Sequence, residues 1–142
     1  MKKLLIIVLL LPALALSQDD RHERIKALKT AYITEALSFT PEEAEQFWPV
    51  YNSYQEQMHA LRNAEREEIH RNDKNGVEGL SLSEAKRLVD QLLDYERREW
   101  ELEKTLMANL QKIMSPKKIV LLKISEEKFK RRLLERYKRG KE

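Results

Sequence analysis

Residues 40–61 read TPEEAEQFWPVYNSYQEQMHAL, and this stretch decides the fold. Thr40 stands before Pro41 and three residues before Glu43, which is the capping-box pattern of a helix start with proline at its first position. Apolar residues then recur at alternating spacings of three and four, the period of a helix with one buried face. They are Ala44, Phe47, Tyr51, Tyr54, Met58 and Leu61. The stretch therefore predicts a long amphipathic helix.

The chain on either side of this helix carries signals for three further helices. The first is expected from about residue 21 to residue 37, before the long helix. Residues 72–79 hold two of the three glycines and form the principal turn, and residues 81–84 (SLSE) open the third helix with a second capping-box pattern. Residues 115–116 (Ser-Pro) end the third helix and begin the fourth. The apolar stripe expected on the first helix consists of Ile25, Leu28, Tyr32 and Ala36.

The second and third helices are expected to be equally long. Each covers roughly 32 residues, or about 48 Å at ~1.5 Å per residue. Because one short loop joins two helices of similar length, we expect a long antiparallel helical hairpin on which the shorter first and fourth helices pack. The predicted fold class is all-α, with four helices built on this hairpin.

Composition supports this fold and excludes several classes of site. The chain has 142 residues, of which 36% are charged, with only three glycines, four prolines and no cysteine. The lack of cysteine excludes a disulfide framework, a thiolate metal site and a cysteine nucleophile. The few serines occupy caps or turns, and the carboxylates lie in mixed-sign runs typical of solvated helix faces. We therefore expect no enzyme activity and no cofactor.

The N-terminal residues 1–17 have the layout of a secretory signal peptide. Two lysines follow Met1, an apolar run covers residues 4–16, and small residues stand at Ala15 and Ser17. The apolar run is shorter than the ~20 residues that a membrane-spanning helix needs, so an uncleaved anchor is the lesser alternative. We expect cleavage after Ser17 and a single exported all-helical domain over residues 18–142.

Charge is unevenly distributed along residues 18–142. From residue 116 onward there are 11 basic and four acidic side chains, whereas residues 18–115 contain 14 basic and 20 acidic ones. In an exported protein we expect no nucleic acid on such a basic helix. An acidic client segment, a membrane sensor or an anionic membrane are the alternatives to a plain solvated face. The residues expected to bind a partner are Trp48, Trp100, Lys128, Phe129, Arg131, Arg132, Arg136 and Arg139.

The three histidines are weak candidates for a metal site. His59 and His70 each close a Glu-x-x-His pattern, the spacing used in di-iron helical bundles. Both lie on the same expected helix, 11 residues or ~16 Å apart, and therefore cannot share one ion. His22 lies near the start of the processed chain, where fraying is expected. We favour solvated surface histidines, with a weak or intermolecular metal site as the alternative.

A helix-start pattern occurs twice, 75 residues apart. Each copy places an apolar residue, a hydroxyl cap, a proline and two charges at the start of a helix. The copies are Phe39-Thr40-Pro41-Glu42-Glu43 and Met114-Ser115-Pro116-Lys117-Lys118. With Phe47-Trp48-Pro49, they resemble the L-T-x-x-Q helix starts of the Spy/CpxP-like periplasmic proteins. The resemblance is strongest to the Bacteroidetes-type sensors of ECF-type sigma factors and periplasmic heavy-metal sensors. Phe39 replaces the leucine of that motif and Glu43 replaces its glutamine.

This resemblance implies a cradle-shaped antiparallel homodimer of long hairpins in the periplasm. It implies a stress-response protein that binds unfolded or damaged envelope proteins without ATP, or that modulates a membrane stress sensor. A metal-responsive sensor linked to an ECF sigma factor is the first alternative. A purely structural helical spacer is the second.

Overall fold

The computed structural model describes residues 16–140, which form four α-helices and no strand. The helices are α1 (Leu16–Leu37), α2 (Pro41–Asn75), α3 (Leu82–Leu110) and α4 (Pro116–Arg139), with a 3-10 turn, η1 (Val77–Gly79), between α2 and α3. The expected all-α class and the four helices are confirmed. The predicted signal peptide falls mainly on residues 1–15, which lie outside the described residues. Within the described residues, no helix combines the length and apolar character needed to cross a membrane.

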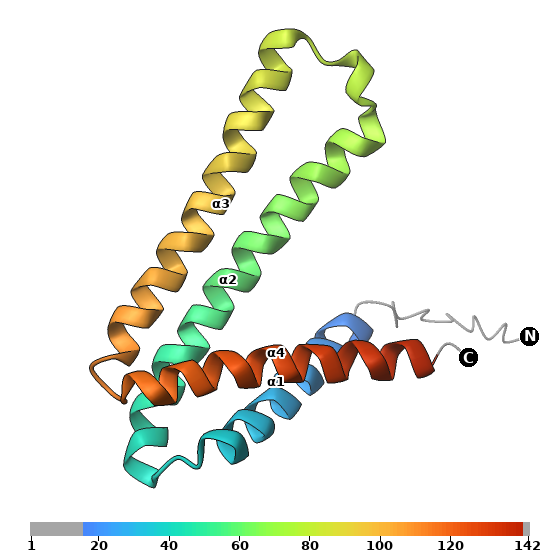
Figure 1. Cartoon of the computed structure of the whole chain (residues 1–142). Coiled ribbons are helices and arrows are strands. Elements are labelled where there is room, and N and C mark those ends of the chain that lie inside the picture. The colour runs from blue at the N-terminus through green and yellow to red at the C-terminus, as the bar shows by residue number, and fades with distance from the viewer. Residues whose placement is uncertain (1–15, 141–142) are drawn as a thin grey trace, which may run out of the picture.

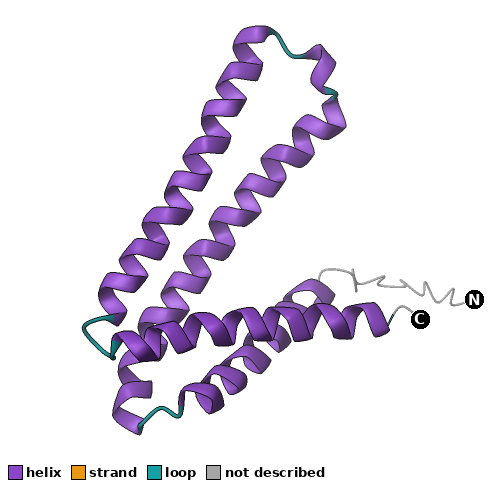
Figure 2. Cartoon of the chain, viewed as in Figure 1, coloured by secondary structure: helices purple, strands orange, loops and turns teal. Residues whose placement is uncertain are grey.

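The helices form two antiparallel pairs that diverge from a common junction (Figure 1). One pair is the predicted hairpin of α2 and α3, and the other consists of α1 and α4. The expectation of equal hairpin helices is wrong, because α2 has 35 residues and α3 has 29. The third helix ends at Leu110, where residues 111–113 turn toward α4 (Figure 2).

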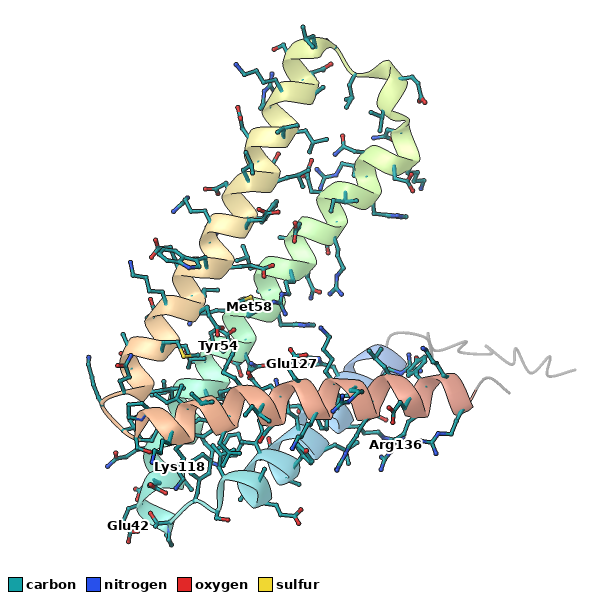
Figure 3. The ribbon with its side chains drawn as sticks, viewed as in Figure 1. Glu42, Tyr54, Met58, Lys118, Glu127 and Arg136 are labelled. Atoms are coloured by element: carbon teal, nitrogen blue, oxygen red, sulfur yellow. The ribbon has the colours of Figure 1, made fainter. Side chains whose placement is uncertain are left out.

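The two copies of the helix-start pattern cap their helices and contact each other. The Thr40 hydroxyl accepts a hydrogen bond from the Glu43 backbone N–H (3.2 Å), and the Glu43 carboxylate accepts one from the Thr40 N–H (3.1 Å). At the start of α4 the Ser115 hydroxyl accepts from the Lys118 N–H (3.3 Å). Lys118 Nζ then donates to Glu43 Oε2 at 2.5 Å. One ion pair therefore joins the first turns of α2 and α4, near the junction end shown in Figure 3.

All four helices contribute to one hydrophobic core at the junction. Its buried residues are Ile33, Leu37, Phe47, Tyr51, Leu106, Leu110, Met114, Ile119 and Leu122. The core includes Ile33 and Leu37 of α1, whereas Leu28 of the predicted stripe is exposed, so that stripe is partly wrong. Within the described chain, no side chain between Leu61 and Leu106 is buried. The outer part of the hairpin is therefore an arm without a core of its own.

The 75-residue repeat is also a structural repeat. If α1 is matched to α3 and α2 is matched to α4, the contacting pair α2–α3 corresponds to the contacting pair α4–α1. Residues 75 apart meet at the junction: Glu43 contacts Lys118, and the Tyr51 hydroxyl donates to Glu126 at 2.5 Å. These two contacts therefore join equivalent positions of the two halves of the chain.

We expect Leu110→Ala to lower the free energy of unfolding by about 2–5 kcal/mol, because Leu110 is fully buried in the junction core. The matched control is Leu93→Ala on the same helix, where the side chain is 57% exposed and the change should stay within about 0.5 kcal/mol. Urea unfolding followed by circular dichroism measures both. Equal effects of the two substitutions would contradict the assignment of the core.

Candidate functional site

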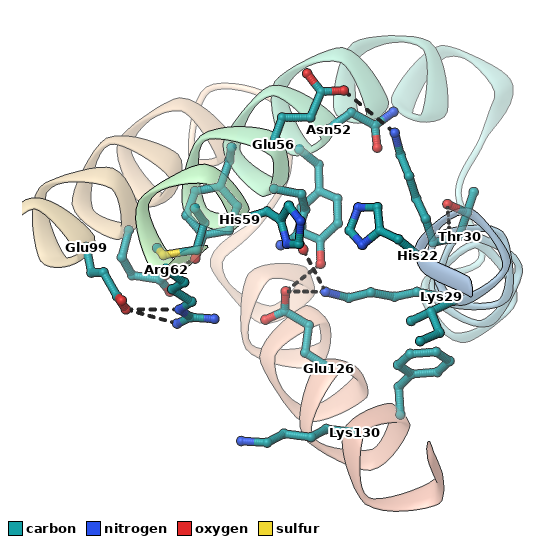
Figure 4. A pocket seen from close by; sticks show the side chains of 18 of the residues that line it. His22, Lys29, Thr30, Asn52, Glu56, His59, Arg62, Glu99, Glu126 and Lys130 are labelled. Atoms are coloured by element: carbon teal, nitrogen blue, oxygen red, sulfur yellow. Dashed lines mark hydrogen bonds and ion pairs between the residues drawn. The ribbon is translucent and has the colours of Figure 1, made fainter. Parts of the chain in front are cut away.

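The two helical pairs enclose a cleft of about 760 Å³, with walls from all four helices (Figure 4). Apolar and aromatic side chains line it beside charged ones. The apolar lining includes Ile25, Met58, Trp100, Phe129 and Leu133. The charged lining includes Lys29, Arg62, Glu99, Glu103, Lys123 and Glu126. This mixture of surface types distinguishes the cleft from the junction core below it.

Glu126 of α4 organises the base of the cleft. Its carboxylate accepts a hydrogen bond from the Tyr51 hydroxyl at 2.5 Å and lies 3.9 Å from Lys29 Nζ. Lys123, three residues earlier on α4, lies 3.2 Å from the second oxygen of the same carboxylate. Glu126 thus connects α1, α2 and α4 at one point.

Glu103 of α3 extends this network to the fourth helix. Lys123 Nζ donates to Glu103 Oε1 at 2.5 Å, and the Tyr54 hydroxyl donates to Glu103 Oε2. Burial acts to raise the pKa of Glu103, but the hydrogen bonds from Lys123 and Tyr54 outweigh it and lower the pKa. Burial likewise acts to lower the pKa of Lys123, but the hydrogen bond to Glu103 and the charge of Glu126 raise it. Both groups therefore stay charged at neutral pH and bridge α3 to α4.

Burial also shifts the other titratable groups of this network. It raises the pKa of Tyr51, with a further contribution from Glu126, and it raises the pKa of Tyr54, with a further contribution from Glu103. The two phenols therefore remain protonated hydrogen-bond donors at neutral pH. Burial lowers the pKa of Lys29, and Glu126 opposes this shift. The network balances its own charges and joins the helices.

Further ion pairs and one large aromatic side chain line the walls of the cleft. Arg62 of α2 donates from Nε and Nη2 to Glu99 of α3, both at 3.1 Å. Trp100, next to Glu99, is 58% exposed, and Lys104 Nζ lies 4.7 Å from the centre of its ring. An exposed indole at a concave surface offers a large apolar contact area to a ligand.

The structure brings together two of the three histidines. The rings of His22 on α1 and His59 on α2 stack with centroids 4.2 Å apart, and His59 Nε2 hydrogen-bonds the Asn63 side chain at 3.0 Å. Burial, followed by the proximity of His22, lowers the pKa of His59. His70 does not line the cleft. Within residues 16–140, no group of three or more His, Asp or Glu side chains is arranged to hold a metal ion.

The other residues expected at a site fall into four groups. Trp100 and Phe129 line the cleft. Trp48 does not: it packs against Phe39 and Phe47 at the edge of the junction core. The motif residues Pro41 and Pro116 begin α2 and α4, Thr40 and Ser115 cap them, and Met114 is in the core. The basic residues of α4 that were expected to bind a partner are all exposed and lie outside the cleft: Lys128, Arg131, Arg132, Arg136 and Arg139.

The polar network of the cleft was missed from the sequence. Tyr51 and Tyr54 were predicted as members of an apolar seam, and they do lie on that side of α2. Glu103, Lys123 and Glu126 occur in mixed-sign stretches that look like any solvated helix face. Only the 75-residue offset between Tyr51 and Glu126, the same as that between the two capping motifs, gave a signal that could have connected them.

We expect Glu103→Gln to lower the free energy of unfolding by about 1 kcal/mol at pH 7, a discounted value for a charged hydrogen bond at a partly exposed site. The pKa of Glu103 is lowered in the folded protein, so the ionised carboxylate stabilises the fold. This stabilisation is complete above the ordinary glutamate pKa of about 4.3 and is lost as the pH falls below that value. The difference between wild type and variant should therefore shrink below pH 4. Urea unfolding at several pH values measures it. The control is Glu101→Gln, an exposed position on the same helix; a difference independent of pH would contradict the assignment.

Comparison of the chain with protein-family models, with curated proteins and with solved structures finds no match. The residues of the chain itself are therefore the guide to its chemistry. They provide a cleft with walls from four helices, in which apolar side chains and paired charges lie side by side.

Proposed function

We propose that this chain is an exported, periplasmic stress-response protein that holds unfolded polypeptide in the cleft between its two helical pairs, without ATP. The observation that carries the proposal is the lining of the cleft. Unfolded segments present apolar and charged side chains in no fixed order, and the cleft offers partners for both. Apolar contact is non-directional, so it suits clients of many sequences.

The charges of the cleft suit weak and reversible binding. Arg62 of α2 and Glu99 of α3 are paired at a surface that remains partly exposed. Partly exposed ion pairs contribute little to stability, so a charged client residue can exchange with one partner at small cost. Apolar side chains such as Trp100 and Phe129 then supply the larger part of the contact.

The hairpin arm supports adaptation to different clients. The α2–α3 hairpin forms one wall of the cleft, and the arm, which is the outer part of this hairpin, lacks a buried core. Segments with few buried apolar contacts open and move at low free-energy cost. The junction, in contrast, is well packed, so the arm can adjust while the base of the cleft keeps its shape.

The leader sequence supports an exported site of action. An oxidising compartment permits disulfides, but this chain has none and depends on helix packing. The resemblance to Spy/CpxP-like proteins favours the same class of function, and a membrane stress sensor is the alternative occupant of the cleft. A cradle-like homodimer is part of the proposal, supported by exposed apolar residues on α3 such as Leu82 and Val89.

We expect purified residues 18–142 to suppress aggregation of several unrelated unfolded proteins at or below equimolar ratio. Trp100→Ala should weaken this suppression several-fold, because it removes an aromatic contact from the cleft wall. Light scattering measures aggregation, and Leu93→Ala provides a matched change of an exposed apolar residue on the same helix. Sizing chromatography with light scattering separates the proposed dimer from a monomer.

Several outcomes would count against the proposal. Equal weakening by Trp100→Ala and Leu93→Ala would remove the cleft as the binding surface. A lack of suppression with every client, combined with capture of one membrane protein, would favour a sensor-modulating role. A rigid monomer with no client affinity would favour the structural spacer.

The metal-responsive alternative has one structural feature in its favour, the contact between His22 and His59. If a divalent ion binds there, His22→Ala and His59→Ala should each abolish binding, whereas His70→Ala should leave it unchanged. Calorimetric titration with zinc, copper and nickel measures this. Equal binding by all three variants, or no binding by the wild type, would exclude this pair as a metal site.

A further inference from the structure

Helix α4 presents a third side that neither the junction core nor the cleft uses. The core side includes Ile119 and Leu122, and the cleft side includes Lys123 and Lys130. The remaining side carries three exposed aliphatic residues close together. Val120 is 58% exposed, Leu121 39% and Ile124 44%. Ile124 is four residues after Val120 and three after Leu121, so its side chain neighbours both on the helix surface, and the three residues form one aliphatic patch on a convex surface.

Exposed cations surround this aliphatic patch and continue along α4. They are Lys117, Lys128, Arg131, Arg132, Lys138 and Arg139. Two acids, Glu127 and Glu135, lie among them, and Glu135 Oε2 is 3.9 Å from Arg139. Arg132 lies 5.1 Å from the centre of the Tyr32 ring at the boundary with α1. The cations outnumber the acids, so this side of α4 is basic over most of its 24 residues, about 36 Å.

We propose that the outward side of α4, formed by the aliphatic patch and its surrounding cations, docks on the surface of an anionic phospholipid bilayer. A helix with this combination lies in the plane of the interface, where aliphatic side chains enter the headgroup boundary and cations contact phosphates. Lysine and arginine extend their hydrocarbon stems along the apolar region and keep their charges at the phosphates.

Two features favour a bilayer over an acidic protein segment. The surface is the convex side of a single helix, and Val120, Leu121 and Ile124 do not line the cleft. An acidic segment would also satisfy the cations but leave the aliphatic patch in water, whereas a bilayer accommodates both. The cleft lies on a different side of α4, so docking through the outward side leaves the cleft open. The inference is therefore independent of the function proposed for the cleft.

The test is sedimentation of the protein, purified after export of the full chain, with vesicles of equal parts phosphatidylglycerol and phosphatidylcholine, and with vesicles of phosphatidylcholine alone. We expect binding to the anionic vesicles that weakens as salt is raised, and little binding to the neutral ones. The triple variant Lys128→Glu, Arg131→Glu and Lys138→Glu should lose more than about 100-fold in binding, since each cation near such a surface contributes about fivefold.

The matched control for charge is Lys74→Glu, Lys86→Glu and Arg87→Glu. It makes the same change in net charge at exposed positions near the far end of the hairpin, and it should retain most of the binding. For the aliphatic patch, Val120→Ser with Ile124→Ser should weaken binding about tenfold. Val89→Ser with Leu93→Ser, at exposed positions of α3, should not. Circular dichroism checks that every variant keeps its helices.

Four results would overturn the proposal. The first is that the wild type does not sediment with anionic vesicles. The second is that it binds neutral and anionic vesicles equally. The third is that the two triple variants lose vesicle binding equally. The fourth is a change of oligomeric state by the Val120→Ser and Ile124→Ser variant with vesicle binding intact, which would assign the patch to a protein contact.

Discussion

The packing of four helix ends at one junction determines the rest of the structure. Phe47 and Leu122, 75 residues apart, are both fully buried there, and the pair of Glu43 with Lys118 joins the first turns of α2 and α4. Because buried residues of all four helices pack together at this point, the junction sets the angle at which the two pairs diverge, and the stacked rings of His22 and His59 add a contact between α1 and α2 farther along these helices. The cleft exists because of that angle. Its shape therefore depends on side chains that lie outside it.

Polar bonds at the base of the cleft reinforce the junction. Glu126 and Glu103 hold residues from every helix, and burial keeps their tyrosine partners protonated. The cleft is therefore tightly packed at its base and solvent-exposed toward the hairpin arm. That gradient of packing, from the fully buried Leu110 to the exposed Trp100 on the same helix, is what a protein needs to hold clients of differing shape. The basic outward side of α4 belongs to a separate surface.

Local patterns in the sequence predicted the helices, because capping and periodicity act within a few residues. Thr40, Ser81 and Ser115 each cap the helix expected of them. Such local patterns do not predict which residues of different helices contact each other. The meeting of His22 with His59, the packing of Trp48 at the core and the exposure of Leu28 all depend on how the four helices are arranged in space. The cleft network depends in the same way on the junction, and it was not predicted.

The most direct test of the central claim is an NMR titration of the isotope-labelled protein with an unlabelled unfolded client. The account predicts chemical-shift changes at the indole N–H of Trp100 and at backbone amides around Phe129 and Met58, on three walls of the cleft. The amides of residues 72–81, near the tip of the hairpin, should not shift. Changes confined to that tip or to the outer side of α3, with the cleft resonances unmoved, would contradict it.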